Sequence, residues 1–153
     1  MKYNIEKLIE LDLLKKIPRS KIKAKKSIKN AEFWIKESKN NFKSKSFRSC
    51  ILTSYLAIFH AARSILFVNG FREKSHFAIA RFLEDKYVNK NLLEEKWIKM
   101  LDYYRETRHK DQYSIYFITT KDEAKEILDF SKEFLEEMKK LLNKINKNLK
   151  TKR

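Results

Sequence analysis

Hydrophobic residues recur at every third or fourth position along most of the chain, which is the spacing that places them on one face of an α-helix. The most regular stripe occupies the end of the chain and follows the sequence "TKDE". Thr120 and Glu123 of that sequence have the spacing of a capping box, which marks a helix start. We therefore expect a long final helix whose apolar stripe comprises Ala124, Ile127, Leu128, Phe134, Leu135, Met138, Leu141, Leu142, Ile145 and Leu149.

Three more long helices follow from the same spacing. The first runs from about Ser20 to Phe42, and lysines cover most of it outside a narrow apolar stripe. The second, about Phe47 to Asn69, is the most apolar, so we expect it to be buried at the centre of the fold. Gly70 follows it directly, where helices commonly end in a left-handed residue. The third begins near Leu92, and its stripe comprises Leu93, Trp97, Leu101 and Tyr104.

The remaining segments are shorter. Residues 5–17, "IEKLIELDLLKKI", have near-helical spacing and precede Pro18, so a helix that ends there is predicted. The sequence "FREKSHF" is expected to be a connection, with Ser75 capping a short helix that reaches about Val88.

The composition supports a bundle of helices. The chain has 153 residues, the length of one domain, and 42% of them are hydrophobic, which is enough for a core. A single Gly and a single Pro are too few for the turns of a β-rich fold. The prediction is an all-α, up-and-down bundle of four or five helices, one domain over 1–153, with an N-terminal helix within 1–20 and a basic tail at 146–153.

The apolar middle of the chain bears on its location. Residues 51–68 are just long enough to suggest a membrane span, but they include His60 and Arg63, so a buried bundle helix is expected. The N-terminus lacks the apolar run of an export signal, and a cytoplasmic protein is expected. Cys50, the single cysteine, is interpreted as a buried thiol. No Cys and His residues have zinc-site spacing, and we expect neither a metal nor a cofactor.

The charge of the chain is strongly positive and uneven. The formal net charge is +16, and residues 15–48 hold thirteen Lys and Arg but two acidic residues. A second basic run, "KKLLNKINKNLKTKR", closes the chain. Such patches attract nucleic acid or an acidic partner. Lysine-rich usage also accompanies ion-pair networks at high temperature, or codon bias, and the composition leaves both explanations open.

The sequence "RHKDQY", residues 108–113, holds the side chains best suited to chemistry. If the apolar stripe of its helix continues, Arg108 lies on it and either pairs with a buried carboxylate or lines a cleft; if the stripe ends earlier, Arg108 is solvated. Arg105, His109 and Tyr113 are spaced four apart and share a neighbouring face. An imidazole beside a guanidinium suits phosphodiester cleavage, because the first moves protons near neutral pH and the second stabilises charge on phosphorus.

Two other histidines stand apart from this cluster in the sequence. His60 lies within the apolar helix and is interpreted as a core histidine with its polar atoms satisfied. His76 lies at a predicted helix start and is either a site residue or an ordinary surface residue.

Three stretches carry a family resemblance. They are "SYLAIFHAARSILFVNGF", "KSHFAIARFLEDKYV", and "YYRETRHKDQY" followed by "TTKDEAKEILDFSKEFLEEM". In this order they resemble the central helix with its Gly turn, the "KxH" segment, and the arginine motif with the last helix of HEPN domains. The similarity is closest to short, stand-alone archaeal and bacterial HEPN proteins, and it spans about residues 42–142.

The resemblance implies a helical bundle that dimerises, with the arginine motif of each subunit facing a shared cleft. Active members of the family are metal-independent ribonucleases whose motif is an Arg, a polar neighbour and then a His several residues further on. Arg108 and His109 match the first two positions. Tyr113 stands where the nearest motif His would be, and a tyrosine, which ordinarily titrates near pH ~10, is a poorer proton shuttle at neutral pH.

Two functions are therefore expected. The first is a HEPN protein that binds RNA or a nucleotide, as the toxin-like half of a pair with a minimal nucleotidyltransferase. The alternative is a non-catalytic helical homodimer that serves as an interaction module for such a nucleotidyltransferase. For the first function the candidate catalytic residues are Arg108, His109 and Tyr113, and the candidate binding residues are Arg105, Arg108, Lys74 and His76.

Overall fold

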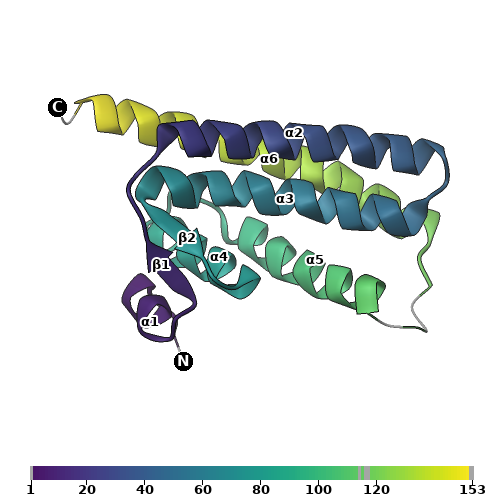
Figure 1. Ribbon diagram of the computed structural model, residues 1–153, viewed down its shortest axis with the longest axis horizontal. Helices are drawn as coiled ribbons and strands as arrows, with labels where there is room; N and C mark the ends of the chain where they lie inside the picture. The colour runs from purple at the N-terminus through teal and green to yellow at the C-terminus, as the bar shows by residue number, and fades with distance from the viewer. Residues whose placement is uncertain (1, 114, 116–117, 152–153) are drawn as a thin grey trace.

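Four long helices form a bundle in the computed structural model of the chain (Figure 1), which describes residues 2–113, 115 and 118–151. The central helix is α3, which packs against α2, α5 and α6. The predicted all-α bundle is confirmed. In chain order the elements are α1 (Ile5–Glu10), β1 (Leu14–Lys16), α2 (Lys21–Lys43), α3 (Phe47–Asn69), β2 (Phe71–Glu73), α4 (His76–Leu83), η1 (Glu84–Val88), α5 (Glu95–Tyr113) and α6 (Lys121–Thr151).

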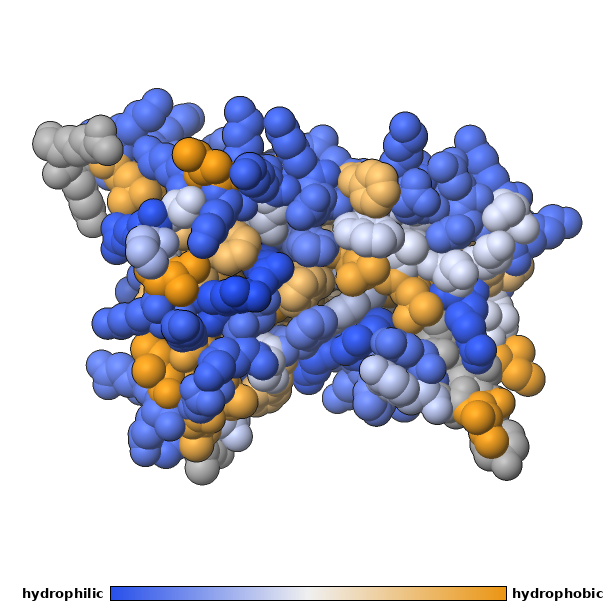
Figure 2. All heavy atoms as spheres, in the orientation of Figure 1, coloured by the Kyte–Doolittle hydropathy of each residue, from blue (hydrophilic) through white to orange (hydrophobic). Residues whose placement is uncertain are grey.

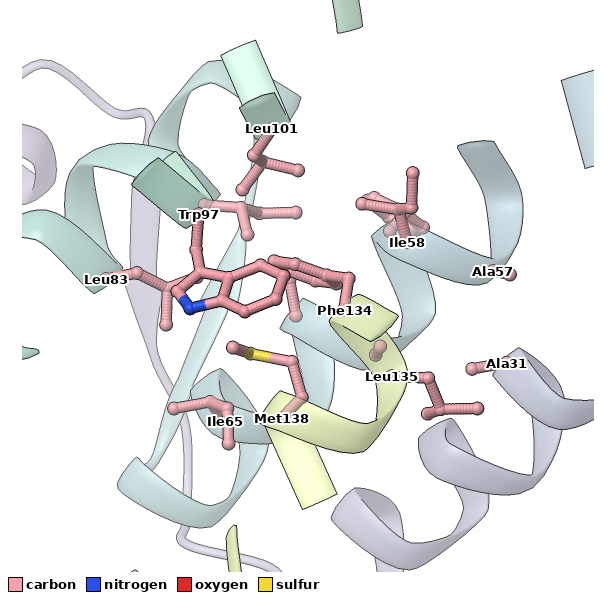
Figure 3. Close-up of a cluster of buried hydrophobic side chains, with 14 of the residues drawn as sticks. Ala31, Ala57, Ile58, Ile65, Leu83, Trp97, Leu101, Phe134, Leu135 and Met138 are labelled. Atoms are coloured by element: carbon pink, nitrogen blue, oxygen red, sulfur yellow. The ribbon is translucent and has the colours of Figure 1, made fainter. Parts of the chain in front are cut away.

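The core forms around α3 because that helix is apolar on most of its circumference. Thirteen of its 23 residues are buried, and side chains from α5 and α6 converge on it (Figure 3). Small, fully buried residues on α2 and α3 allow the two helix backbones to approach closely. Prominent members of the core are Ala31, Ala57, Ile58, Ile65, Leu83, Trp97, Leu101, Phe134, Leu135 and Met138.

Side-chain caps fix where three of the helices begin. The hydroxyl of Ser20 accepts from the backbone N–H of Lys23 at 3.0 Å, which starts α2. Ser75 accepts from Phe77 N–H at 3.2 Å at the start of α4, and Thr120 accepts from Glu123 N–H at 3.2 Å at the start of α6. These contacts satisfy N–H groups that have no partner inside the helix, and they confirm the predicted boundaries.

The predicted helix over residues 5–17 is wrong beyond Glu10. The chain turns at Asp12, which has a left-handed φ of 59°, and continues as β1. β1 pairs antiparallel with β2, in the segment expected to be a connection, with Leu14 opposite Glu73. The spacing of Leu8 and Leu14 buries both side chains in this arrangement as well, so apolar periodicity did not distinguish a helix from a turn and strand.

The second half of the chain follows the prediction closely. The short helix after Ser75 is α4, and it continues through the π-helical turn η1 to Val88, as expected. α5 starts at Glu95, slightly later than the predicted Leu92. In α6 the predicted stripe is buried from Ala124 to Leu142, and Ile145 and Leu149 are half-buried.

The apolar character of α3 is explained by its place in the bundle. It is the one described helix with the length and composition to cross a membrane, and 67% of that span is buried inside the protein. Cys50 on this helix is fully buried, and burial raises the pKa of its thiol. Its sulfur lies 3.4 Å from the Ser38 hydroxyl. The interpretation of Cys50 as a buried thiol is confirmed.

Gly70 ends α3 in a left-handed backbone conformation that lowers stability when other residues adopt it. A Gly70→Ala variant should therefore be less stable than the natural protein. Its φ is +81°, and an added Cβ would lie 2.9 Å from the carbonyl oxygen of Ile17. The backbone N–H of the same residue, Ile17, donates to Gly70 O at 2.9 Å. This hydrogen bond holds the Ile17 backbone in place, so its carbonyl cannot easily move away from an added Cβ. We expect a loss of about 1–3 kcal/mol in the free energy of unfolding, measured by urea denaturation.

A matched control is available at the end of α2. Lys45 has a left-handed φ of 62° and is exposed, so Lys45→Gly should leave stability unchanged or raise it slightly. A Gly70→Ala variant as stable as the natural protein would contradict this account of the α3 terminus.

Candidate functional site

The apolar stripe of α5 continues into an arginine that is itself packed. Trp97, Leu101 and Tyr104 are buried, and about one turn further Arg108 is half-buried. Its guanidinium carbon lies 5.0 Å from the centre of the Tyr55 ring on α3. A cation over an aromatic face is attracted to it, and the contact restricts the orientation of the planar guanidinium. Arg108 therefore extends the packing face of α5 and does not stand free in solvent.

No carboxylate among the described side chains balances the charge of Arg108. Its Nη1 donates to Oε1 of Gln112 at 3.2 Å, and its buried Nε has no hydrogen-bond partner. A guanidinium stays protonated at ordinary pH, so the charge persists despite partial burial. A fixed, half-buried and unbalanced guanidinium favours binding of an external anion, and its planar fork suits the oxygens of a phosphate.

Two more arginines share a single carboxylate beside Arg108. Asp102 on α5 accepts from Nη1 of Arg105 at 2.7 Å through Oδ1, and from Nη2 of Arg81 on α4 through Oδ2. Both guanidiniums also lie over the Phe77 ring, at 5.5 Å for Arg105 and 5.2 Å for Arg81. Asp102 holds the two arginines in place, and Arg81 also lies 3.8 Å from Oε1 of Glu84 through its Nε. We call Arg81, Arg105 and Arg108 the arginine cluster.

A tyrosine–histidine pair lies beneath the arginine cluster. The Tyr55 hydroxyl and Nδ1 of His76 are 2.9 Å apart, and the His76 ring stacks on Phe59 with centroids separated by 4.2 Å. Burial raises the pKa of Tyr55 to about 12, so its hydroxyl keeps its proton at neutral pH. When the ring proton of a neutral His76 is on Nε2, the hydroxyl of Tyr55 donates to Nδ1.

The surroundings of His76 disfavour its charged form. Burial, and after it the positive charges of Arg108 and Arg105, together lower its pKa from 6.5 to about 4. His76 is therefore neutral at physiological pH and adds no positive charge to the arginine cluster. His76 is half-buried and packed against Tyr55 and Phe59, beside the arginine cluster.

The structure separates the other predicted candidates. His109 joins Arg105 and Arg108 in lining a surface hollow of about 320 Å³. Tyr113 is 63% exposed, and its ring contacts His109 at a centroid distance of 4.9 Å. Lys74 forms an exposed ion pair with Asp12 at 2.6 Å. Of the predicted residues, Arg105, Arg108, His76 and His109 thus gather around one face, while Tyr113 lies at its edge and Lys74 is engaged elsewhere.

Sequence reasoning missed the residues that hold the arginine cluster in place. Tyr55 and Phe59 are four apart on α3, within the stretch "SYLAIFHAA", and this spacing was the one available signal for a shared face. Asp102 is three residues from Arg105 on the same helix, so that pair had a signal in the spacing, but its contact with Arg81 on α4 had none. His60 was expected to be a core histidine, and it is half-buried and lines a second hollow.

The arrangement suits recognition of phosphate. Guanidiniums supply charge and paired donors, and the imidazoles supply groups that exchange protons. Within the described parts of the chain, no group of three His, Cys, Asp or Glu side chains is placed to bind a metal ion.

Comparison with known proteins gives concordant matches. The family model described as "HEPN domain" matches residues 24–141, which confirms the predicted resemblance and extends it toward the N-terminus. A Methanocaldococcus jannaschii protein named "Putative toxin" is 29% identical over 133 residues, covering 87% of this chain and 97% of the relative. An Archaeoglobus fulgidus protein named "UPF0332 protein" is 27% identical over 117 residues, covering 76% of this chain and 93% of the relative.

The low pKa of His76 makes a prediction about pH. Because folding lowers its pKa from 6.5 to about 4, the unfolded chain binds more protons than the folded chain between these values. The contribution of His76 to stability is therefore fully present above pH ~6.5 and is lost as the pH falls toward ~4. We expect urea denaturation to give a lower free energy of unfolding at pH ~5 than at pH ~7.

The titration of the ring itself separates this effect from those of other groups. By NMR, the His76 ring should titrate well below 6.5 in the natural protein, and Arg108→Gln should raise its pKa by removing a nearby positive charge. Lys99→Gln, an exposed change on the same helix, should leave the His76 titration unaltered. An unshifted His76 pKa in the natural protein would contradict the described packing.

Proposed function

The chain belongs to the HEPN domain family, and on that premise we propose that it is a toxin-like HEPN protein that binds RNA through its arginine cluster. The relative from M. jannaschii bears the name "Putative toxin" and is aligned over nearly its whole length, which supports the toxin-like part of the proposal. RNA is favoured as the ligand because the cluster combines fixed guanidiniums with aromatic rings and imidazoles on one face.

The single observation that carries the proposal is the state of Arg108. A half-buried guanidinium that has no carboxylate partner among the described side chains lowers the free energy of unfolding, unlike one paired on the surface. Such a residue is typical of a binding site for anions, where the ligand supplies the missing partner. The formal net charge of +16 adds long-range attraction for a polyanion such as RNA.

The same residues suggest how RNA cleavage would proceed if the protein is a nuclease. The 2′-oxygen of a ribose attacks the adjacent phosphorus, the 5′-oxygen of the next nucleotide leaves, and Arg108 stabilises the charge on the pentacoordinate phosphorus. His109 lines the same hollow as Arg108 and is the candidate to take the proton from the attacking 2′-hydroxyl and to return it to the departing 5′-oxygen. Tyr113 is exposed at the edge of this hollow, so it is the weakest of the three catalytic candidates.

A second candidate function follows from Tyr113. This residue occupies the position where the ribonuclease motif of the family has histidine, and the described residues place no other histidine beyond His109 on α5. A HEPN protein that binds without cutting would act as a homodimer that engages a minimal nucleotidyltransferase, with the arginine cluster facing the shared cleft.

The decisive test is a ribonuclease and RNA-binding assay in the presence of a chelator, on the natural protein and Arg108→Ala. We expect salt-sensitive binding of single-stranded RNA, and Arg108→Ala should weaken this binding. The variant should also reduce the magnitude of the slope of log association constant against log salt concentration by about 1. If the protein cleaves RNA, the chelator should have no effect and Arg108→Ala should abolish cleavage.

Lys99→Ala is the matched control, since Lys99 lies on the same helix with its side chain 73% exposed. Absence of any salt-sensitive RNA binding by the natural protein would refute the first function. Binding without cleavage, together with stable co-purification of a nucleotidyltransferase, would favour the second.

A further inference from the structure

A second basic hollow lies further along α3 from the arginine cluster, toward the end of that helix. It has a volume of about 310 Å³ and is lined by residues from the start of α2, the second half of α3 and β2. Figure 2 shows strongly hydrophilic side chains gathered over β2 and the adjoining end of α3. The lining residues that matter here are Lys23, Lys26, His60, Arg63, Phe67 and Arg72, and we call this site the basic hollow.

The charge in the basic hollow is largely unbalanced. Arg63 is paired with Glu73, with Nε and Oε1 2.8 Å apart. Lys23, Lys26 and Arg72 form no ion pair with any described carboxylate, and no acidic residue is among those lining the hollow. Burial, and after it the positive charge of Arg63, lowers the pKa of His60. These features suit a phosphate-bearing ligand.

A row of packed side chains, of which Tyr55 and Phe59 are buried, lies between the basic hollow and the arginine cluster and fixes their spacing. Tyr55, Phe59, Arg63 and Phe67 are four apart and lie along one face of α3. Arg63 lies over both Phe59, at 5.4 Å, and Phe67, at 5.0 Å. Phe59 stacks on His76, and His76 contacts the hydroxyl of Tyr55. The guanidinium of Arg108 lies over the ring of Tyr55. The row spans ~18 Å at the rise of an α-helix, which is the length of several nucleotides.

We propose that the basic hollow binds a backbone phosphate of the same RNA strand that contacts Arg108, so that one strand spans the two sites. Lys23, Lys26 and Arg72 pair with the phosphate, and the half-buried Phe67 ring offers a stacking surface for a base. The identity of the ligand as RNA rests on the proposed function, whereas the affinity for phosphate follows from the hollow itself.

Length-dependent RNA binding by the full chain tests this path. Fluorescently labelled single-stranded RNAs of about 4 and about 12 nucleotides would be titrated against the natural protein and Lys23→Gln/Lys26→Gln. We expect the variant to bind the longer RNA about tenfold more weakly, with a salt slope lower by about 2, and to bind the shorter RNA unchanged at the arginine cluster.

The matched control lies on the same helix. Lys36→Gln/Lys39→Gln removes the same charge from exposed positions nearer the other end of α2, and it should leave both affinities close to those of the natural protein. If the two double variants weaken binding of the longer RNA equally, the inference is overturned, because the net charge of the protein alone would then explain binding.

A phosphate probe separates failure of this inference from failure of the proposed function. Pyrophosphate would be titrated into the ¹⁵N-labelled protein, with the amide signals of Phe67 and Arg72 as readout. If the natural protein binds no RNA but these signals shift, and do not shift in Lys23→Gln/Lys26→Gln, the phosphate site is retained and the RNA function is rejected. If neither RNA nor pyrophosphate affects the basic hollow, the inference is overturned.

Discussion

The burial of α3 is the constraint on which the rest of the fold depends. α3 is apolar on too much of its surface to face water, whereas α2 and α6 each have one apolar stripe and a lysine-rich outer face. The stripes of α2 and α6 are covered only if these helices surround α3. The β1–β2 ribbon and α4 then pack near its C-terminal end, and Gly70 allows the chain to turn there.

The candidate site is a consequence of how the remaining face of α3 is covered. α4 and α5 bring Arg81, Arg105 and Arg108 onto aromatic rings, and Asp102 holds two of these arginines. Side chains placed in this way lose little freedom when a ligand binds, which favours affinity for anions. The concentration of like charge opposes folding, and the surrounding apolar core offsets that cost. The neutral state of His76 limits the repulsion.

Much of the fold and part of the candidate site were predictable from local patterns. Stripes and caps predicted the four long helices because burial of one face and satisfaction of the first N–H groups depend on neighbours within a few residues. The same reasoning failed for residues 5–17, where pairing with β2, far along the chain, replaced the continuation of α1. Arg108 was found by extending a stripe, but periodicity did not distinguish a packed arginine from a solvated one.

By itself the sequence determined the all-α bundle, the family resemblance, the positive charge and the position of the arginine motif, since each of these is written in composition, spacing or short motifs. Only the tertiary structure decided which groups meet. It joined Tyr55 to His76, placed Asp102 between arginines of α4 and α5, and set the basic hollow further along α3 from Arg108. These contacts depend on how helices distant in sequence pack and orient their side chains, and a pattern along one helix contains no information about the face that its neighbour presents.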